Sequence, residues 1–237
     1  MRILLKIYGN PVDRQQERGL NNDRNVNVHN DRYVVKYNQD RHEQAGGAMS
    51  RIEQKLLTRQ RILEAAGRGF RRGGFGGVGV DGLAKDAGVT SGAFYVHFGT
   101  KTEAFKEAVT QGLRELKEGV LHYQLTHGRD WWPEFVRFYL GLKRTCDLSD
   151  SCALQSLSPE VARADGALRE DFEAGLRSVA RVIVSGPASP HVPRTVESAC
   201  TALATLVGTV TLARAVHSPE FAAQIAQSAE RVMLGTK

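Results

Sequence analysis

The sequence lacks the features that mark secreted, membrane-spanning or disulfide-stabilised proteins. It has three cysteines in 237 residues, an odd number without paired spacing, so we expect a reduced, cytoplasmic protein. The longest charge-free stretch, between Glu197 and Arg214, is short and diluted by threonines, which predicts a buried helix and no membrane partner. Arg2 and Lys6 interrupt the first apolar run, so we expect no secretory signal.

Asparagine is absent after residue 48, which separates the beginning of the chain from the rest. All seven asparagines lie in residues 1–48, and this stretch contains no serine. Its apolar residues form no sustained helical pattern, so it cannot bury enough surface to offset the entropy of ordering. We predict that residues 1–48 are a disordered arm, or a non-native extension before a start at Met49.

The charge is distributed unevenly over the remaining chain. Residues 49–107 hold ten basic and six acidic side chains, whereas residues 108–237 hold fourteen of each. A basic excess confined to one segment is typical of a nucleic-acid-binding module attached to a neutral domain.

The hydrophobic periodicity after Met49 predicts helix after helix and no strand, so the predicted fold class is all-α. Pairs such as Ser50 with Glu53 and Thr100 with Glu103 have the spacing of capping boxes. Ser158-Pro159 and Ser218-Pro219 each predict a helix that starts with proline at its first position. The longest predicted helix near the C-terminus runs from about residue 194 to residue 216.

A helix-turn-helix is predicted within the basic segment. Residues 83–89 supply a short helix and a turn in which Gly88 can adopt a left-handed conformation, and residues 90–95 begin the second helix. Gly79 stands at the N-cap of the first of these helices, where glycine is tolerated at little cost.

A longer pattern resembles the DNA-binding domain of TetR/AcrR-family transcriptional regulators. The residues that carry this resemblance are 61–66, Phe70, 74–75, 83–84, 87–89, 92–95, 97–98 and Lys101. It implies a three-helix helix-turn-helix domain over residues 49–107 and a helical ligand-binding and dimerisation domain over residues 108–237. It also implies a homodimer that binds a double-stranded DNA operator and is released by a small-molecule effector.

The resemblance indicates which residues contact DNA. Tyr95, His97 and Lys101 are expected to bind phosphates, although Tyr95 and His97 are also compatible with core positions. Thr90, Ser91 and Gly92 are expected to face the major groove at the start of the recognition helix. None of these three side chains can read a base through two hydrogen bonds, so specificity is expected to depend on backbone fit, thymine methyl groups and DNA shape.

The effector site is predicted from aromatic residues that gather between positions 131 and 139. Trp131, Phe135 and Tyr139, together with Cys152, are candidates for the wall of an apolar pocket. Core packing is the ordinary explanation for the aromatics. Cys146 and Cys152 are alternatively redox-sensing thiols, although the nearby basic residues are weak evidence for this.

Three functions compete on this sequence. The first is a ligand-responsive repressor, and the second is an architectural or nucleoid-associated DNA-binding protein without a ligand. The third is an enzyme, but the chain lacks a phosphate-binding glycine loop, paired carboxylates and a nucleophile–base motif, so no catalytic residue is expected. The histidines are scattered without metal-ligand spacing, and we expect neither a metal nor a cofactor.

Overall fold

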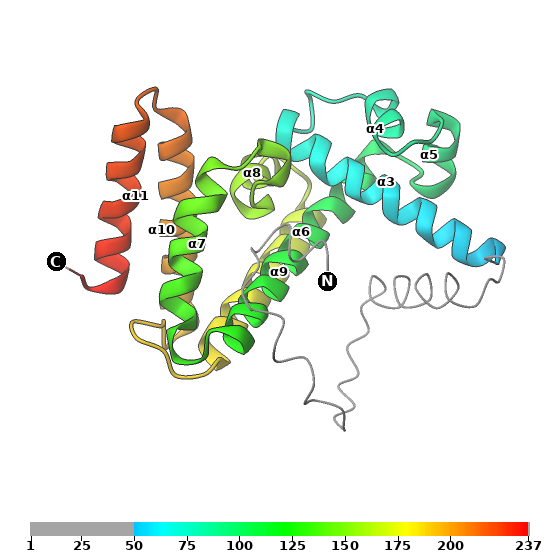
Figure 1. Cartoon of the computed structure of the whole chain (residues 1–237). Helices are drawn as coiled ribbons and strands as arrows, with labels where there is room; N and C mark the ends of the chain where they lie inside the picture. The colour runs from blue at the N-terminus through cyan, green and yellow to red at the C-terminus, as the bar shows by residue number, and fades with distance from the viewer. Residues whose placement is uncertain (1–49, 237) are drawn as a thin grey trace, which may run out of the picture. The chain divides into compact units, whose positions relative to one another are not determined.

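The computed structural model describes residues 50–236, which are all-α as predicted (Figure 1). The described residues form nine α-helices and no strand. The α-helices are α3 (Arg51–Gly73), α4 (Val80–Asp86), α5 (Ser91–His97), α6 (Lys101–Thr126), α7 (Trp131–Thr145), α8 (Ala153–Val161), α9 (Gly166–Ser185), α10 (Val196–Ala215) and α11 (Pro219–Leu234). Two 3-10 turns, η1 (Gly128–Asp130) and η2 (Leu148–Asp150), precede α7 and α8.

The chain divides into two compact units, whose boundary lies inside α3 between Ile62 and Leu63. The description below concerns the unit that begins at Leu63. The predicted arm or extension over residues 1–48 lies outside the described residues. The predicted division at residues 107 and 108 stays a prediction.

The second half of α3 packs with α4, α5 and the start of α6 around buried aromatic rings. Phe70 is fully buried, and its ring lies edge-on to Phe105 with 5.1 Å between centroids. Gly69 permits this packing, because an added Cβ would stand 2.5 Å from the Leu83 side chain. The close contact between α3 and α4 therefore depends on glycine at this position.

The helices after α6 pack against α6 and against one another. α6 lies along α9 and contacts α7 and α8, while α10 contacts α7, α9 and α11 (Figure 1). Gly175 on α9 allows close approach to α6, since a Cβ there would stand 2.6 Å from the Leu113 side chain. Buried apolar residues on these facing helices make up the core.

Most predicted helix starts are confirmed. The hydroxyls of Thr90, Thr100 and Ser218 each accept a hydrogen bond from a backbone N–H in the first turn of α5, α6 and α11. The prediction for Ser158-Pro159 is wrong. Both residues lie inside α8, where the Ser158 hydroxyl donates to the Leu154 carbonyl.

The following helix, α9, instead starts at an acidic cap. Asp165 accepts a hydrogen bond from the Leu168 N–H at 2.8 Å. The serine–proline pair therefore predicts a helix start correctly at residue 218 and wrongly at residue 158. The chain before Ser158 is already helical, whereas the chain before Ser218 is not.

Helix α10 is buried on one face only, so the expectation of a buried helix holds in part. Among residues 50–236 it is the single helix long and apolar enough to span a membrane, and 33% of its most apolar 18-residue stretch is buried. Leu203, Leu206 and Val210 are buried against the neighbouring helices. On the other side, Thr201, Ala204, Thr211, Leu212 and Ala215 are exposed.

Candidate DNA-binding surface and effector site

The turn between α4 and α5 has the geometry of a helix-turn-helix. Gly88 adopts φ +66°, a left-handed conformation that favours glycine, as predicted. The Val89 N–H donates to the Ala84 carbonyl at 3.0 Å and closes the turn. Gly79 is the N-cap of α4 and supplies no side-chain hydrogen bond, also as predicted.

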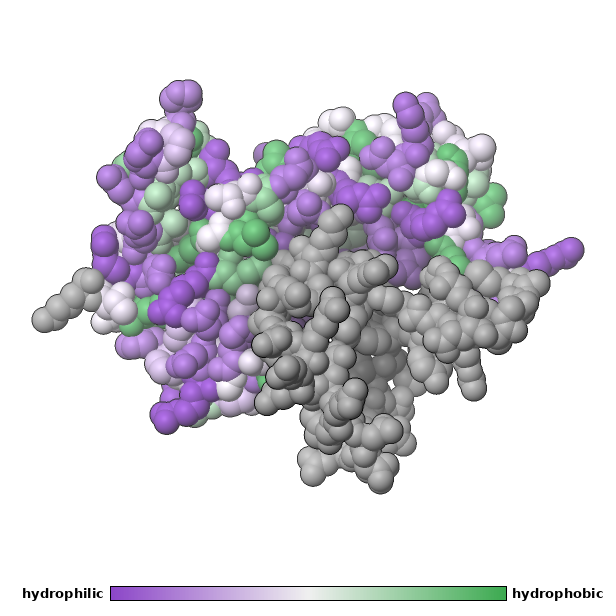
Figure 2. Space-filling view, viewed as in Figure 1, coloured by the Kyte–Doolittle hydropathy of each residue, from purple (hydrophilic) through white to green (hydrophobic). Residues whose placement is uncertain are grey.

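The recognition helix α5 buries Phe94 and turns its opposite face outward. Gly92, Tyr95 and Val96 share this outward face, because they are three and four residues apart. Tyr95 is 52% exposed, which makes it a surface residue and not a core residue. Figure 2 shows hydrophobic residues, coloured green, at the surface over α5.

Val96 is a candidate DNA-contacting residue that the sequence reasoning missed. It is 73% exposed, although valine on a short helix would ordinarily be assigned to the core. The signal was present in the spacing, since Val96 follows Gly92 by one helical turn and does not share the face of Phe94.

The first residues of α5 are already engaged within the protein. The Thr90 hydroxyl accepts from the Ala93 N–H at 3.2 Å, and the Ser91 hydroxyl donates to the Asp81 carboxylate at 2.5 Å. The Ser91 bond connects α5 to α4. It leaves only the lone pairs of Ser91 available for an outside partner.

Lys101 and His97 lie at the junction between α5 and α6. Lys101 is the first residue of α6, and its Nζ atom lies 4.5 Å from the centroid of the Phe75 ring. A cation in the first turn of a helix opposes the helix dipole, and an anion bound beside it would offset this cost. His97 is the last residue of α5 and is half-buried.

The predicted effector residues lie on two helices, the three aromatics on α7 and the cysteine at the start of α8. Trp131, Phe135 and Tyr139 all lie on α7 and are at most 1% exposed. The ring of Phe135 lies 6.1 Å from that of Tyr139. Cys152 is the buried N-cap residue of α8.

Trp132 belongs to the same cluster and carries a buried donor without a partner. Its ring stacks on Phe135 with 5.9 Å between centroids, and the residue is 1% exposed. Its indole N–H finds no acceptor within residues 50–236, whereas that of Trp131 donates to the Pro187 carbonyl at 2.9 Å. Nearby, burial and then Glu134 raise the pKa of Tyr123 to about 12.

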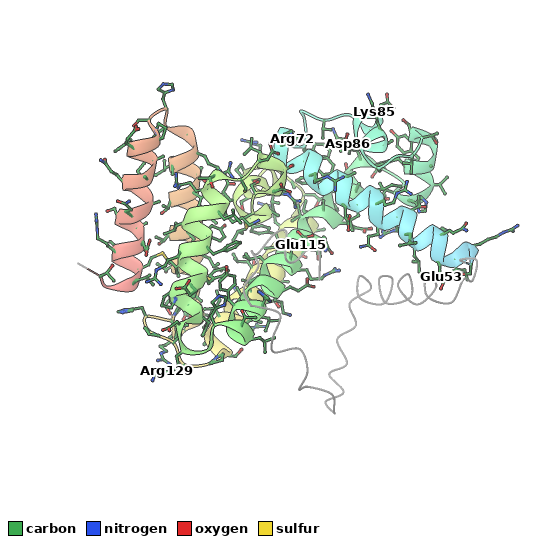
Figure 3. All side chains as sticks on the ribbon, viewed as in Figure 1. Glu53, Arg72, Lys85, Asp86, Glu115 and Arg129 are labelled. Atoms are coloured by element: carbon green, nitrogen blue, oxygen red, sulfur yellow. The ribbon has the colours of Figure 1, made fainter. Side chains whose placement is uncertain are left out.

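The segment between α7 and α8 connects these helices to the end of α3. The Arg71 Nε atom donates to the Ser149 carbonyl at 2.7 Å, and Arg72 pairs with Asp147 at 3.2 Å. Arg71 also lies 3.8 Å from the Glu115 carboxylate on α6; Figure 3 labels Arg72 and Glu115. Side-chain and backbone hydrogen bonds from Ser149, followed by Arg72, lower the pKa of Asp147 to about 2.

Comparison with known proteins agrees with this arrangement. Residues 62–108 match the model of a family described as bacterial regulatory proteins of the tetR family. No curated protein matches the chain in sequence.

Three solved structures share the fold. The reduced form of Escherichia coli NemR is 17% identical, with a TM-score of 0.58 over 75% of this chain and 95% of that one. A TetR-family transcriptional regulator from Agrobacterium tumefaciens is 18% identical, with a TM-score of 0.59 over 75% and 98%. A TetR-family regulator from Cytophaga hutchinsonii is 19% identical, with a TM-score of 0.59 over 80% and 98%.

The helix-turn-helix and the helical fold thus define a DNA-binding transcriptional regulator. The match over residues 62–108 and the shared fold support a TetR-family regulator.

Proposed function

We propose that this regulator is a repressor that binds a palindromic operator as a homodimer in the cytoplasm and is released by a small apolar or amphipathic effector. The observation that carries the proposal is the outward face of α5, where Tyr95 and Val96 are exposed beside the N-terminus of α6. An exposed valine and tyrosine on a helix of a helix-turn-helix are explained by a partner that covers them.

The proposed DNA contacts follow from the chemistry of each side chain. Tyr95, His97 and Lys101 bind phosphates and fix the position of α5. Val96 and the methyl group of Thr90 contact thymine methyl groups in the major groove, which suits a helix without Arg, Asn or Gln in its first turn. Ser91 holds α5 against α4 through Asp81 and accepts hydrogen bonds from base edges.

The homodimer is proposed to form through the exposed face of α10 together with α11. Between Glu197 and Arg214 this helix carries no charged residue, and Gly208 has open space where a Cβ would stand. Phe221 and Val232 on α11 are 53% and 80% exposed. A second copy of the chain would cover all of these residues in a symmetric contact.

The effector is proposed to bind at the aromatic cluster of α7, and Cys152 at the start of α8 stays a predicted contact. The buried indole N–H of Trp132 requires an acceptor, and a ligand carbonyl or ether oxygen would supply one. The effector is therefore expected to be a largely apolar molecule with a hydrogen-bond acceptor. It would release DNA by binding one arrangement of the dimer more tightly than the other.

The salt dependence of DNA binding tests the operator contacts. Replacing Lys101 with Ala should weaken binding to all duplexes and reduce the salt slope by about 0.9 for each phosphate that Lys101 neutralises. Arg129→Ala is the matched control, because Arg129 is an exposed cation at the other end of α6 (Figure 3). Fluorescence anisotropy between low and physiological salt measures both variants. Equal slopes for Lys101→Ala and the unmodified protein would contradict the proposal.

A further inference from the structure

Lys143 near the end of α7 is a buried cation without a carboxylate partner in the described part of the chain. It is 7% exposed, and its Nζ atom donates to the Asp150 carbonyl at 2.7 Å. Burial lowers the pKa of Lys143. Among residues 50–236 no carboxylate lies within ion-pair distance of it, and Glu115, whose charge favours the ammonium, is already paired with Arg71. A buried ammonium is ordinarily paired, so this position favours an anion from outside the chain.

Arg214 of α10 is a second cation at this end of α7, and it has a different role. Its Nη2 atom donates to the Lys143 carbonyl at 2.7 Å, to the Cys146 carbonyl at 2.9 Å and to the Cys146 sulfur at 3.3 Å. These bonds satisfy carbonyls at the end of α7 that have no partner within the helix. The ammonium of Lys143, by contrast, uses one of its three N–H groups within residues 50–236 and keeps the others for a ligand.

A second buried group on the same face of α7 also points to a ligand. The indole N–H of Trp132 has no acceptor among residues 50–236, although the residue is 1% exposed. Lys143 follows Trp132 by eleven residues, which is three helical turns and about 16 Å along the axis, so both lie on one face. Phe135 and Val136 lie between them and are fully buried. This face of α7 therefore has a neutral donor at one end, apolar side chains in the middle and a cation at the other end.

We propose that the effector is a long amphiphile whose carboxylate pairs with the Lys143 ammonium and whose far end carries a neutral acceptor for the Trp132 indole N–H. This ligand class rests on the proposed function, because it names the effector of that regulator. A carboxylate supplies the charge that the buried ammonium lacks, and a charge-assisted hydrogen bond is stronger than a neutral one. The apolar chain of such a molecule would cover Phe135 and Val136 over a span of about 16 Å.

Lys143 connects the proposed ligand to the end of α3. Its Nζ atom holds the Asp150 carbonyl in η2, and the Ser149 carbonyl of the same turn accepts from Arg71 of α3. A carboxylate at Lys143 competes with the Asp150 carbonyl for the ammonium. The ligand also reaches this buried face only when α7 moves away from the helices packed on it. Both changes displace η2, so we expect the ligand to change how α3 is held and to weaken operator binding.

Calorimetric titration of the unmodified protein, without DNA, tests the ligand class. The probe is the monomethyl ester of dodecanedioic acid, which has a carboxylate at one end and an ester carbonyl at the other. It should bind about 30-fold more tightly than the uncharged dimethyl ester, although the dimethyl ester is the more apolar molecule. Equal affinity for the two esters, or no binding of the monomethyl ester, would overturn the proposal.

Three variants assign each end of the probe to its residue. Lys143→Met should weaken binding of the monomethyl ester about 30-fold and leave binding of the dimethyl ester unchanged. Arg144→Met is the matched control, because Arg144 is a half-buried cation that donates to the Leu140 carbonyl of its own helix at 3.1 Å. Both esters should bind this control as they bind the unmodified protein, and both should bind Trp132→Phe about tenfold more weakly. Equal losses for the two esters in Lys143→Met, or no loss in Trp132→Phe, would overturn the assignment.

The regulatory consequence is tested with a duplex that the protein selects from a randomised pool. Saturating monomethyl ester should weaken duplex binding about tenfold, and the same concentration should leave Lys143→Met unaffected. Unchanged duplex affinity of protein saturated with this ester would overturn the coupling through η2. A protein that binds no duplex would instead refute the proposed function, while the titration without DNA would still decide the ligand class.

Discussion

The neighbouring tryptophans of α7 offer a matched pair for measuring the cost of the unpartnered donor. Trp131 and Trp132 are equally buried, but only the Trp131 indole N–H has an acceptor. A buried N–H without an acceptor costs about 1 to 3 kcal/mol, and an ordinary hydrogen bond contributes about 1 kcal/mol. Replacing Trp132 with Phe removes the cost, whereas the same change at Trp131 removes the bond to Pro187. The loss of ring volume is common to both variants.

Trp131→Phe should therefore reduce the free energy of unfolding by about 2 kcal/mol more than Trp132→Phe does. Urea unfolding followed by circular dichroism measures the difference, at one protein concentration because a dimer is expected. If Trp132→Phe is as destabilising as Trp131→Phe or more so, the donor has a partner and the effector argument loses its anchor. An effector that needs the donor should bind Trp131→Phe and fail to bind Trp132→Phe.

Two further predictions concern the dimer and the segment after α7. Gly208→Glu should yield a monomer in sedimentation at micromolar concentration. Gly141→Glu is the control, because Gly141 also lies on a helix with open space at the Cβ position, and this variant should remain a dimer. A dimer in both variants would exclude the proposed α10 contact. The pKa of Asp147 lies below its ordinary value, so stability that depends on its carboxylate is present above pH 3.8 and is lost as the pH falls through about 2. Ser149 contributes more to this lowering of the Asp147 pKa than Arg72 does. Carboxyl titration by NMR should therefore show a larger rise of the Asp147 pKa in Ser149→Ala than in Arg72→Ala. The reverse order would contradict this assignment.

Local signals in the sequence predicted the features that neighbouring residues determine. The caps at Thr90, Thr100 and Ser218 and the turn at Gly88 each depend on a few adjacent residues, and all four are confirmed. Ser158-Pro159 carries the same local signature as Ser218-Pro219. It is misread because the helix had already begun five residues earlier, at Ala153.

Features that depend on distant contacts were not predictable. Arg214 and Cys146 are 68 positions apart, and nothing in either neighbourhood predicts that the guanidinium reaches the sulfur. The two tryptophans of α7 are neighbours in the sequence. The indole N–H of Trp131 nevertheless donates to a carbonyl 56 positions away, whereas that of Trp132 has no acceptor within residues 50–236. Val96 is exposed because it lies on the face of α5 opposite to the buried Phe94. The packing of α3, α4 and α6 determines which face of α5 is buried.

Selection of duplexes from a randomised pool, with the mass of the selected complex, tests the central claim most directly. A dimeric repressor whose two α5 helices enter successive major grooves should enrich an inverted repeat with half-sites about 10 base pairs apart or a multiple of this. Sedimentation of the complex should then give an even number of chains on each duplex. A pool that remains random after repeated rounds, or one chain bound to an asymmetric site, would contradict the account.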